Sequence, residues 1–451
     1  MDPLLKCFSY SLAVDGELLG AELQVNRAWV KMLAKAGLIT SAELRRLLRG
    51  LQGVGKELKS DNPHESIDPK WIHHYEDIHT LIQARLEKKV GDVAKKIHTG
   101  RSRNELVITS TRIYLRQRVR QIESGIADFQ RALVASAEKA GEGIIPGMTH
   151  LKKAQPVLLA HHLLAYVEML EEDKARLQDL QKRINILPLG SGALAGSGLR
   201  LDQKFLAKEL GFPKISTNSL TAVSDRGFIC ELLSGLSILW VHLSRLAEDF
   251  ILWNSEPFHY VELDDAFATG SSLMPHKKNP DVFELTRARS GIIFGHLVSL
   301  LTLQKGLPLA YNRDLQEDKP ALFDALRKTV LALAVLAPAV RTASWDRKAM
   351  AQAVEDEGLF ATDLLEYLVK KNLPFRQAHE TVGRLIRESI ESQKPVREFS
   401  VQELKRFSRM FDSDVYDLLN AESSVASKKT IGSTHPAKVK QELNRWKRNL
   451  K

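Results

Sequence analysis

Apolar residues recur at alternating steps of four and three along one stretch of the chain, and this spacing constrains the fold more than any other feature. The series consists of Leu115, Val119, Ile122, Ile126, Phe129 and Leu133. A heptad-like repeat of this kind places one apolar stripe along a helix. The pattern therefore predicts a long helix that packs lengthwise against other helices.

Four further stretches have long helical periodicity. They cover residues 157–187, 224–254, 281–303 and 315–340. Helices of about 25 to 30 residues are about 40 Å long, so the five together predict an all-α fold with an elongated central bundle. Helices this long usually bury apolar stripes on more than one face. We therefore expect them to pack between subunits as well, and predict an oligomer.

The chain is expected to form three domains. Residues 1–98 form an N-terminal helical domain, residues 99–345 the long-helix bundle and residues 346–451 a smaller C-terminal helical domain. In the first domain, Ser41 is expected to cap a helix that carries Glu43 in its first turn. The shorter helices are expected over residues 21–38, 41–58, 75–88, 363–371, 376–392, 401–407 and 437–451.

Composition indicates a globular protein that acts on small anions. Of 451 residues, 44% are hydrophobic and 27% charged, and the net charge is +10. Because Lys and Arg alternate with acids, we expect small-molecule anions and not nucleic acid as partners. Cys7 and Cys230 lie far apart and form neither a disulfide framework nor a metal motif. With no signal peptide or membrane span expected, the prediction is a cytoplasmic protein.

Residues 270–281 form the most informative loop of the chain. They read Gly-Ser-Ser-Leu-Met-Pro-His-Lys-Lys-Asn-Pro-Asp. Pro275 and Pro280 disfavour helix before them, while helical spacing resumes after Asn279, which we expect to act as a helix cap. Donor groups and lysines at the start of a helix suit an anion. The alternative is an ordinary polar loop.

Other polar loops offer further candidates. Residues 98–104 contain two arginines and Asn104, which suit a carboxylate, although solvated arginines at a helix start explain them equally well. Residues 187–198 are glycine-rich but lack the strand and the Gly-Lys-Ser/Thr ending of a nucleotide loop. His73, His74 and His79 lack the spacing of metal ligands, so no metal is expected.

The motifs together resemble a known family. Gly-Ser-Ser-Leu-Met-Pro-x-Lys-x-Asn-Pro at residues 270–280 resembles the signature of the fumarase/aspartase superfamily. A finer resemblance links the chain to the argininosuccinate lyases and the delta-crystallin-like proteins, with matches in family order from about Ser11 to Thr434. These matches lie at residues 76–79, 98–104, 149–151, 187–193, 305–308 and 311–319.

This resemblance implies a fold and an activity. The implied subunit is a three-domain all-α chain, four copies of which form a homotetramer with a twenty-helix core and active sites shared between three subunits. The implied reaction is reversible cleavage of argininosuccinate to arginine and fumarate, in arginine biosynthesis, without metal or organic cofactor. Two alternatives remain: another fumarate-releasing carbon–nitrogen lyase acting on a different N-substituted aspartate, or a non-catalytic structural relative.

The reaction requires specific groups, which the resemblance assigns. A base must remove a carbon-bound proton, and the negative charge that develops must be stabilised. The resemblance implies that Ser271 is the base on a mobile loop, supported by Lys277 and neighbouring backbone amides. It implies that His150 is the general acid and that Glu284 orients it. The implied substrate contacts are Ser11, Asp15, Asp77, Arg103, Asn104, Thr149, Arg226, Asn279, Tyr311, Gln316 and Lys319.

The chain departs from the family pattern near several of these loops. Glu105 and Leu106 stand in place of Asp-Gln, Lys152 and His276 in place of Gln, and Thr221 and Gly227 in place of Asp. Relative to the family pattern, Thr221 and Gly227 remove two carboxylates and Lys152 adds a cation. The lost carboxylates concern the guanidinium end of the substrate. We therefore expect intact elimination chemistry and leave the amine half of the substrate open.

Overall fold

The computed structural model describes residues 2–60, 67–72 and 74–450, and the fold is all-α, as predicted. His73 and residues 61–66, which fall in an expected polar loop, lie outside the described residues. Within the described residues, each sheet consists of two short strands, and the longest pair is β1 (Ile144–Thr149) with β2 (Lys152–Leu158). Helices therefore make up most of the fold, and short paired strands hold some of the loops between them.

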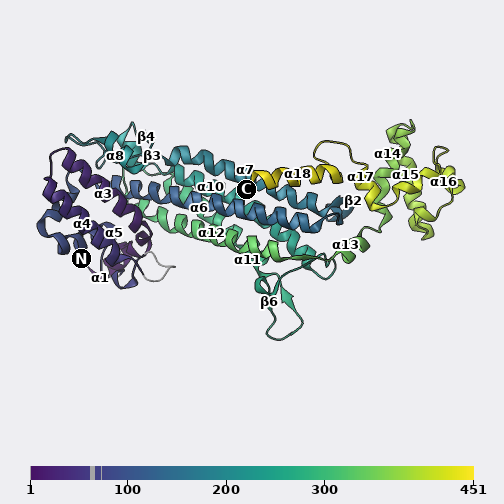
Figure 1. The fold of residues 1–451 in the computed structure, drawn as a ribbon, viewed down its shortest axis with the longest axis horizontal. Helices are drawn as coiled ribbons and strands as arrows, with labels where there is room; N and C mark the ends of the chain where they lie inside the picture. The colour runs from purple at the N-terminus through teal and green to yellow at the C-terminus, as the bar shows by residue number, and fades with distance from the viewer. Residues whose placement is uncertain (1, 61–66, 73, 451) are drawn as a thin grey trace. The chain divides into compact units, whose positions relative to one another are not determined.

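The five long helices are present (Figure 1). They are α6 (Arg103–Ala140), α7 (Leu159–Ile184), α10 (Gly227–Asn254), α11 (Asp281–Gln304) and α12 (Asp318–Thr342). All six residues of the heptad-like stripe, from Leu115 to Leu133, have 0% exposed surface. The prediction of a long helix with one buried stripe is confirmed, and α6 is longer than expected, at 38 residues.

The chain forms two compact units. The first comprises residues 1–124, 173–240 and 290–331, and the second comprises residues 125–172, 241–289 and 332–451. All five long helices contribute residues to both units. The division of the sequence into three domains stays a prediction.

In the first unit, α3 (Leu19–Lys35), α4 (Ser41–Leu58) and α5 (Ile78–Val90) pack around a core that includes fully buried Trp29 (Figure 1). The cap of α4 is Thr40, whose side chain accepts from the Glu43 backbone N–H while the Glu43 side chain accepts from the Thr40 N–H. The expectation of Ser41 as the cap was wrong by one residue. Short elements that the sequence did not predict are α1 (Pro3–Ser9), α2 (Leu12–Asp15), α8 (Gln203–Leu210) and α9 (Ser219–Ser224), with the paired strands β3 (Ile186–Leu187) and β4 (Lys214–Ile215).

In the second unit, β1 and β2 form an antiparallel hairpin that the sequence did not predict. Residues 270–281 differ from expectation in the same way. Two-residue strands, β6 (Thr269–Gly270) and β7 (Lys278–Asn279), pair at the base of the loop, and α11 follows from Asp281. The paired ends fix where the loop leaves and rejoins the fold.

The C-terminal part of the second unit consists of short helices (Figure 1). Four of them match the predicted helices within a few residues, whereas those at Arg347–Ala353 and Ala421–Ala426 were not predicted. The helices are α13 (Arg347–Ala353), α14 (Ala361–Lys370), α15 (Phe375–Ser392), α16 (Val401–Phe407), α17 (Ala421–Ala426) and α18 (Pro436–Asn449), and strands β5 (Val261–Glu262) and β8 (Ser344–Trp345) pair beside them.

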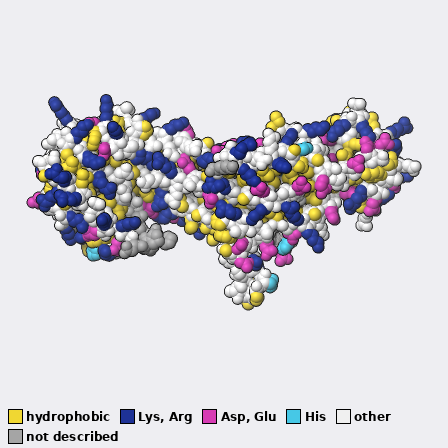
Figure 2. All heavy atoms as spheres, viewed as in Figure 1, with side chains coloured by type: hydrophobic (Ala, Val, Ile, Leu, Met, Phe, Trp, Pro, Cys, Tyr) yellow, Lys and Arg dark blue, Asp and Glu magenta, His cyan; other side chains and the backbone are white. Residues whose placement is uncertain are grey.

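Within the described residues, α10 is the one helix whose length and apolar composition would allow it to cross a membrane, and half of its most apolar window is buried in the protein. Core helices of globular proteins share these properties. Figure 2 shows Lys and Arg side chains interspersed with Asp and Glu over the visible face, in keeping with the alternation of charges in the sequence.

Candidate active site

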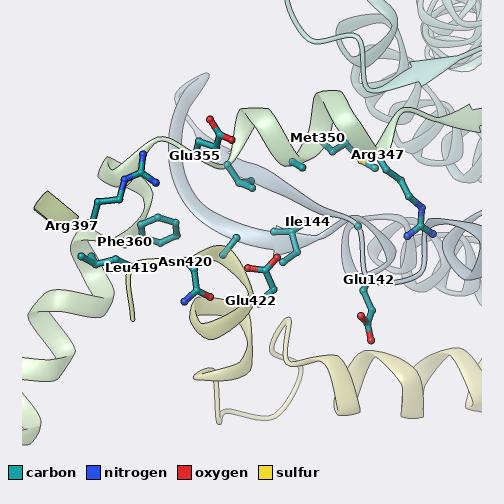
Figure 3. A pocket seen from close by; sticks show the side chains of 14 residues that line it. Glu142, Ile144, Arg347, Met350, Glu355, Phe360, Arg397, Leu419, Asn420 and Glu422 are labelled. Carbon is teal, nitrogen blue, oxygen red and sulfur yellow. The ribbon is translucent and has the colours of Figure 1, made fainter. Parts of the chain in front are cut away.

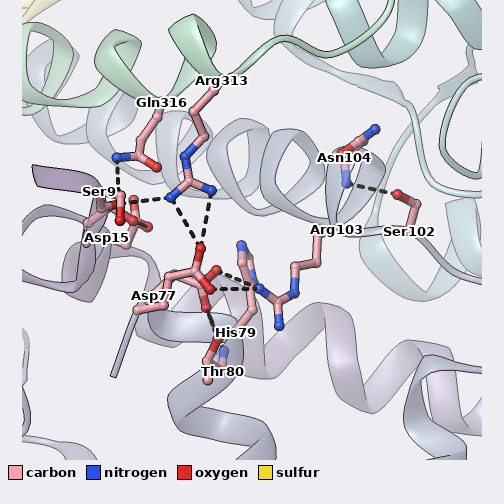
Figure 4. A network of polar contacts seen from close by, with 12 residues as sticks. Ser9, Asp15, Asp77, His79, Thr80, Ser102, Arg103, Asn104, Arg313 and Gln316 are labelled. Atoms are coloured by element: carbon pink, nitrogen blue, oxygen red, sulfur yellow. Dashed lines mark hydrogen bonds and ion pairs between the residues drawn. The ribbon is translucent and has the colours of Figure 1, made fainter. Parts of the chain in front are cut away.

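A cavity of about 150 Å³ in the first unit brings together residues that are far apart in the sequence (Figure 4). Its walls include eight of the predicted substrate contacts. These are Ser11, Asp15, Asp77, Arg103, Asn104, Tyr311, Gln316 and Lys319. His79, Val107 and Arg313 complete the lining. The sequence did not assign Arg313 a role, although it lies inside the 311–319 loop.

Asp15, at the end of α2, carries the least satisfied carboxylate of this cavity. Its Oδ2 atom accepts a hydrogen bond from the Ser11 hydroxyl. Its Oδ1 atom is buried and has no hydrogen-bond partner among the described residues. Burial raises the pKa of Asp15, and Lys319 and the Ser11 hydroxyl partly oppose that shift. An unpartnered buried oxygen of this kind is costly unless a ligand donates to it.

Lys319 supplies a buried cation to the same cavity. Its Nζ atom donates to Asp318 Oδ1 at 2.9 Å, and Asp318 Oδ2 accepts from Arg226 Nε at 2.8 Å. Burial alone would lower the pKa of Lys319, but Asp318 and Asp15 outweigh it and raise the pKa. Arg226 is only 1% exposed and does not line the cavity. In this chain it supports Lys319 through Asp318, and its predicted contact with substrate stays a prediction.

Arg103 and Arg313 bring two more cations to the rim (Figure 4). Asp77 caps α5 by accepting from the Thr80 backbone N–H, and its Oδ2 atom lies 3.1 Å from Arg103 Nη1. Burial tends to raise the pKa of Asp77, but His79, the Thr80 hydrogen bonds and Arg103 together lower it. Arg313 donates to Glu76 and to the Ser9 carbonyl.

A buried pair of side chains forms part of the cavity wall, to which it contributes His79. His79 Nδ1 is 2.9 Å from Glu22 Oε1, and Ser110 donates to Glu22 Oε2 at 2.7 Å. Burial disfavours the charged form of both groups, but their neighbours outweigh it. Glu22, Asp77 and Asp15 raise the pKa of His79. His79, Arg101 and Ser110 lower the pKa of Glu22. The cavity is thus lined by an imidazole with a raised pKa as well as by lysine and arginines.

The second unit holds the predicted base. The Ser271 hydroxyl oxygen accepts from two backbone N–H groups, Leu273 at 3.2 Å and Met274 at 3.0 Å. Two amides aimed at one oxygen favour negative charge on it. Lys277 is exposed in the same loop, and its backbone carbonyl accepts from the Ser271 N–H at 3.2 Å.

The predicted acid, His150, lies at a hairpin tip. Thr149 pairs with Lys152, so His150 and Leu151 form a two-residue turn, with φ angles of 54° and 57°. Positive φ at both positions is typical of a type I′ turn, which normally uses Asn or Gly. His150 is exposed, as is Glu284 in the first turn of α11. The hairpin therefore presents the imidazole to the surroundings and does not bury it.

A second cavity, of about 370 Å³, lies in the second unit between α13 and the segment around α17 (Figure 3). Ile144, Met350 and Phe360 are among its apolar lining, and its charged side chains include Glu142 and Arg347. No predicted site residue lines this cavity. Across residues 2–60, 67–72 and 74–450, no group of three or more His, Cys, Asp or Glu side chains is arranged to hold a metal ion.

Comparison with known proteins identifies the family. Residues 1–295 match a family model described as Lyase, and residues 358–426 match one described as Argininosuccinate lyase C-terminal. The chain is 45% identical to the argininosuccinate lyase of Geobacillus thermodenitrificans over 443 residues, which are 98% of this chain and 95% of that protein. The chain belongs to the argininosuccinate lyase family. The argininosuccinate lyase of Syntrophotalea carbinolica is 42% identical over 98% of this chain and 95% of its own.

Solved structures related to this family member share its fold. EDDS lyase in complex with formate has a TM-score of 0.86 and 28% sequence identity, covering 100% of this chain and 90% of that one. A class II fumarase from Schistosoma mansoni has a TM-score of 0.78 at 16% identity, covering 93% of this chain and 92% of that one, and shows a likeness of fold alone. The resemblance of the sequence motifs to the argininosuccinate lyases is thereby confirmed.

Proposed function

We propose that the protein is an argininosuccinate lyase that reversibly eliminates arginine from argininosuccinate to give fumarate, as a step of arginine biosynthesis in the cytoplasm. The observation that carries the proposal is the cavity around Asp15, in a chain of this family. Its buried carboxylate oxygen suits an ammonium or guanidinium group, and Lys319, Arg103 and His79 suit carboxylates. A substrate with both kinds of group matches that pairing.

Ser271 is the proposed base. A serine hydroxyl is a weak acid, so its alkoxide needs support before it can take a carbon-bound proton. The N–H groups of Leu273 and Met274 donate to that oxygen, and Lys277 on the same loop adds positive charge. Closure of the loop over substrate would remove water and strengthen these interactions.

His150 is the proposed general acid, which protonates the leaving nitrogen. Glu284 is the proposed partner that orients its imidazole, since a histidine acting in catalysis usually needs a second group to fix its ring. Thr149 and Asn279 flank the two loops, where they are proposed to bind substrate. The proposed reaction moves one proton from the substrate carbon to Ser271 and one from His150 to the leaving nitrogen, and it calls for no metal or organic cofactor.

A homotetramer with active sites shared between three subunits is part of the proposal. In the single chain, His150, Lys277 and Glu284 are all exposed, which is a poor setting for acid–base catalysis. The first-unit part of α11 also leaves Ile292, Val298 and Leu301 between 43% and 61% exposed. Exposed apolar residues in a helix that is apolar on all sides support its burial by other subunits.

Light scattering tests this assembly. We expect a mass of four chains, because the apolar faces of the long helices need cover. A variant with Val298→Glu should shift the population to smaller species, because a charge would be buried in the interface. Phe375→Glu, which changes a side chain 65% exposed on α15, is the control and should leave the mass unchanged. A single-chain mass for the unmodified protein would contradict the proposal.

A second candidate is a fumarate-releasing lyase for another N-substituted aspartate. The structural similarity to EDDS lyase favours it, together with the departures at Lys152, Thr221 and Gly227. Against it, neither Thr221 nor Gly227 lines the cavity around Asp15. Both instead line a separate cavity of about 350 Å³ in the first unit.

A fumarate-release assay distinguishes the candidates. The purified protein is given argininosuccinate, EDDS, adenylosuccinate or aspartate, and fumarate absorbance is followed. We expect turnover of argininosuccinate to exceed that of the other compounds by at least about 100-fold in kcat/KM, because a buried carboxylate left unpaired penalises a poorly matched amine. If fumarate is released from one of the other compounds and not from argininosuccinate, the second candidate is favoured. If no compound releases fumarate, a structural role is favoured.

A further inference from the structure

Glu105 is a buried carboxylate that the proposed mechanism does not use. Its side chain lies in the first turn of α6 and has 0% exposed surface. Oε1 accepts from the Ser102 backbone N–H at 3.1 Å. Oε2 accepts from the backbone N–H groups of Gly190 at 2.5 Å and Gly192 at 3.0 Å. One carboxylate therefore joins the start of α6 to the glycine-rich segment 187–198.

The glycine-rich segment is folded tightly around this carboxylate. Gly190 and Gly192 have φ angles of 103° and 61°, which turn their N–H groups inward. A Cβ atom on Gly192 would lie 2.4 Å from the Gly196 carbonyl oxygen, so the turn excludes side chains. This resembles a phosphate cradle in which the anion is supplied by the chain itself. The N–H groups of Gly190 and Gly192 already donate to Glu105, so they are not available to bind a nucleotide phosphate.

The same segment also holds a candidate substrate contact. Asn104 Nδ2 donates to the Ala193 carbonyl at 3.1 Å, and the Asn104 backbone N–H donates to Ser102 Oγ at 3.2 Å (Figure 4). Asn104 and its neighbour Arg103 both line the cavity around Asp15. Glu105 bonds to Ser102 and to the 187–198 segment, and Asn104 also bonds to both of these, so Glu105 acts on Asn104 through them.

Burial raises the pKa of Glu105, while the three backbone N–H groups and Arg101 oppose that rise. Hydrogen bonds that an ionised carboxylate accepts are about twice as strong as neutral ones. The Glu105 side chain reaches both the helix start, through Ser102, and the loop, through Gly190 and Gly192.

We propose that Glu105 is a positioning residue for substrate binding, which fixes Asn104 and Arg103 by clamping the 187–198 segment to the start of α6. The inference rests on the proposed function, because Asn104 and Arg103 act on substrate only if the cavity around Asp15 is the substrate site. It assigns Glu105 no contact with the reacting atoms. Its effect should therefore fall on substrate affinity more than on turnover.

Glu105→Gln and Glu43→Gln form a matched pair for the test. Glu43 is also a glutamate in the first turn of a helix of the first unit, and it accepts from the Thr40 backbone N–H at 2.8 Å, but it is bonded to no glycine loop. In Glu105→Gln we expect KM for argininosuccinate to rise by about 10-fold or more while kcat stays within about threefold, because charged hydrogen bonds are lost. Glu43→Gln should leave both constants within about twofold.

Hydrogen–deuterium exchange measured by mass spectrometry provides a readout that does not depend on activity. Peptides covering residues 187–198 should exchange at least about 10-fold faster in Glu105→Gln, and at the normal rate in Glu43→Gln. Glu105→Asp keeps the charge and serves if the glutamine variant does not fold. Its shorter side chain should also speed exchange in this segment, by about threefold or more.

The outcomes distinguish the proposed function from the positioning role of Glu105. If the unmodified protein releases no fumarate from argininosuccinate, the proposed function fails, and the exchange measurement still tests the clamp. If Glu105→Gln and Glu105→Asp leave KM and exchange at their normal values, the positioning role is overturned. It is also overturned if Glu43→Gln raises KM as much as Glu105→Gln does, since a lost helix cap would then explain the effect.

Discussion

Ser271→Ala should lower kcat for fumarate release by about 1,000-fold or more, because a positioned general base contributes about 100- to 10,000-fold. The substitution removes one oxygen atom from a half-exposed side chain in a loop closed by β6 and β7. The base of the loop should stay paired, since that pairing uses backbone groups only, although the N–H groups of Leu273 and Met274 lose the oxygen to which they donate. Substrate binding should change little, so KM should stay within about threefold.

Ser272 provides the matched control for this experiment. It is the next residue of the same loop, is exposed and also carries a hydroxyl. Ser272→Ala should keep kcat within about threefold of the unmodified protein. Initial rates over a range of argininosuccinate concentrations give both constants, and light scattering checks that the assembly survives. Near-normal turnover in Ser271→Ala would mean that another group removes the proton.

Glu22→Gln should destabilise the protein by about 3 to 5 kcal/mol, because it leaves the buried His79 imidazolium without its counter-ion. His79 and Glu22 side chains are 5% and 1% exposed. Urea denaturation followed by tryptophan fluorescence measures the loss, since Trp29 is buried on the same helix as Glu22. Glu209→Gln breaks the more exposed pair with Lys31 and should cost less than about 1 kcal/mol.

The pH dependence of this difference follows from the two shifted groups. The pKa of His79 is raised above 6.5, so its contribution is complete below that pH and is lost as pH rises through the folded-state pKa. The pKa of Glu22 is lowered below 4.5, so its contribution is complete above that pH and is lost on acidification. The difference in the free energy of unfolding between the unmodified protein and Glu22→Gln should be largest from pH 4.5 to 6.5. It should decrease as the pH rises above that range. An equal gap at every pH would show that the pair is not charged.

Apolar periodicity was enough to place the long helices, because burial of a stripe such as Leu115 to Leu133 leaves a regular record in the sequence. No comparable periodicity marks the hairpin at residues 144–158 in the sequence. Its turn is His150-Leu151, where sequence rules look for Asn-Gly, and Pro146 and Pro156 argue against strands. Pairing between the two segments outweighs both local signals.

The cavity around Asp15 could be anticipated only through family resemblance. Its residues come from stretches as far apart as residues 11 and 319, and no local pattern states which of them meet in space. Spacing argued against a metal role for His79 but did not reveal its partner, which is Glu22. Arg226 lies behind the cavity, paired with Asp318, and spacing alone does not distinguish a buried support from a contact.

The unpartnered oxygen of Asp15 affects which small molecules would inhibit the protein. Succinate and similar diacids carry the carboxylates that Lys319 and Arg103 would attract, but they have no cationic group for Asp15. Each would therefore leave one buried carboxylate oxygen unsatisfied, a penalty that built-in polar groups use to reject incomplete ligands. The proposed enzyme would resist inhibition by abundant diacids through what they lack, without any steric barrier to their entry.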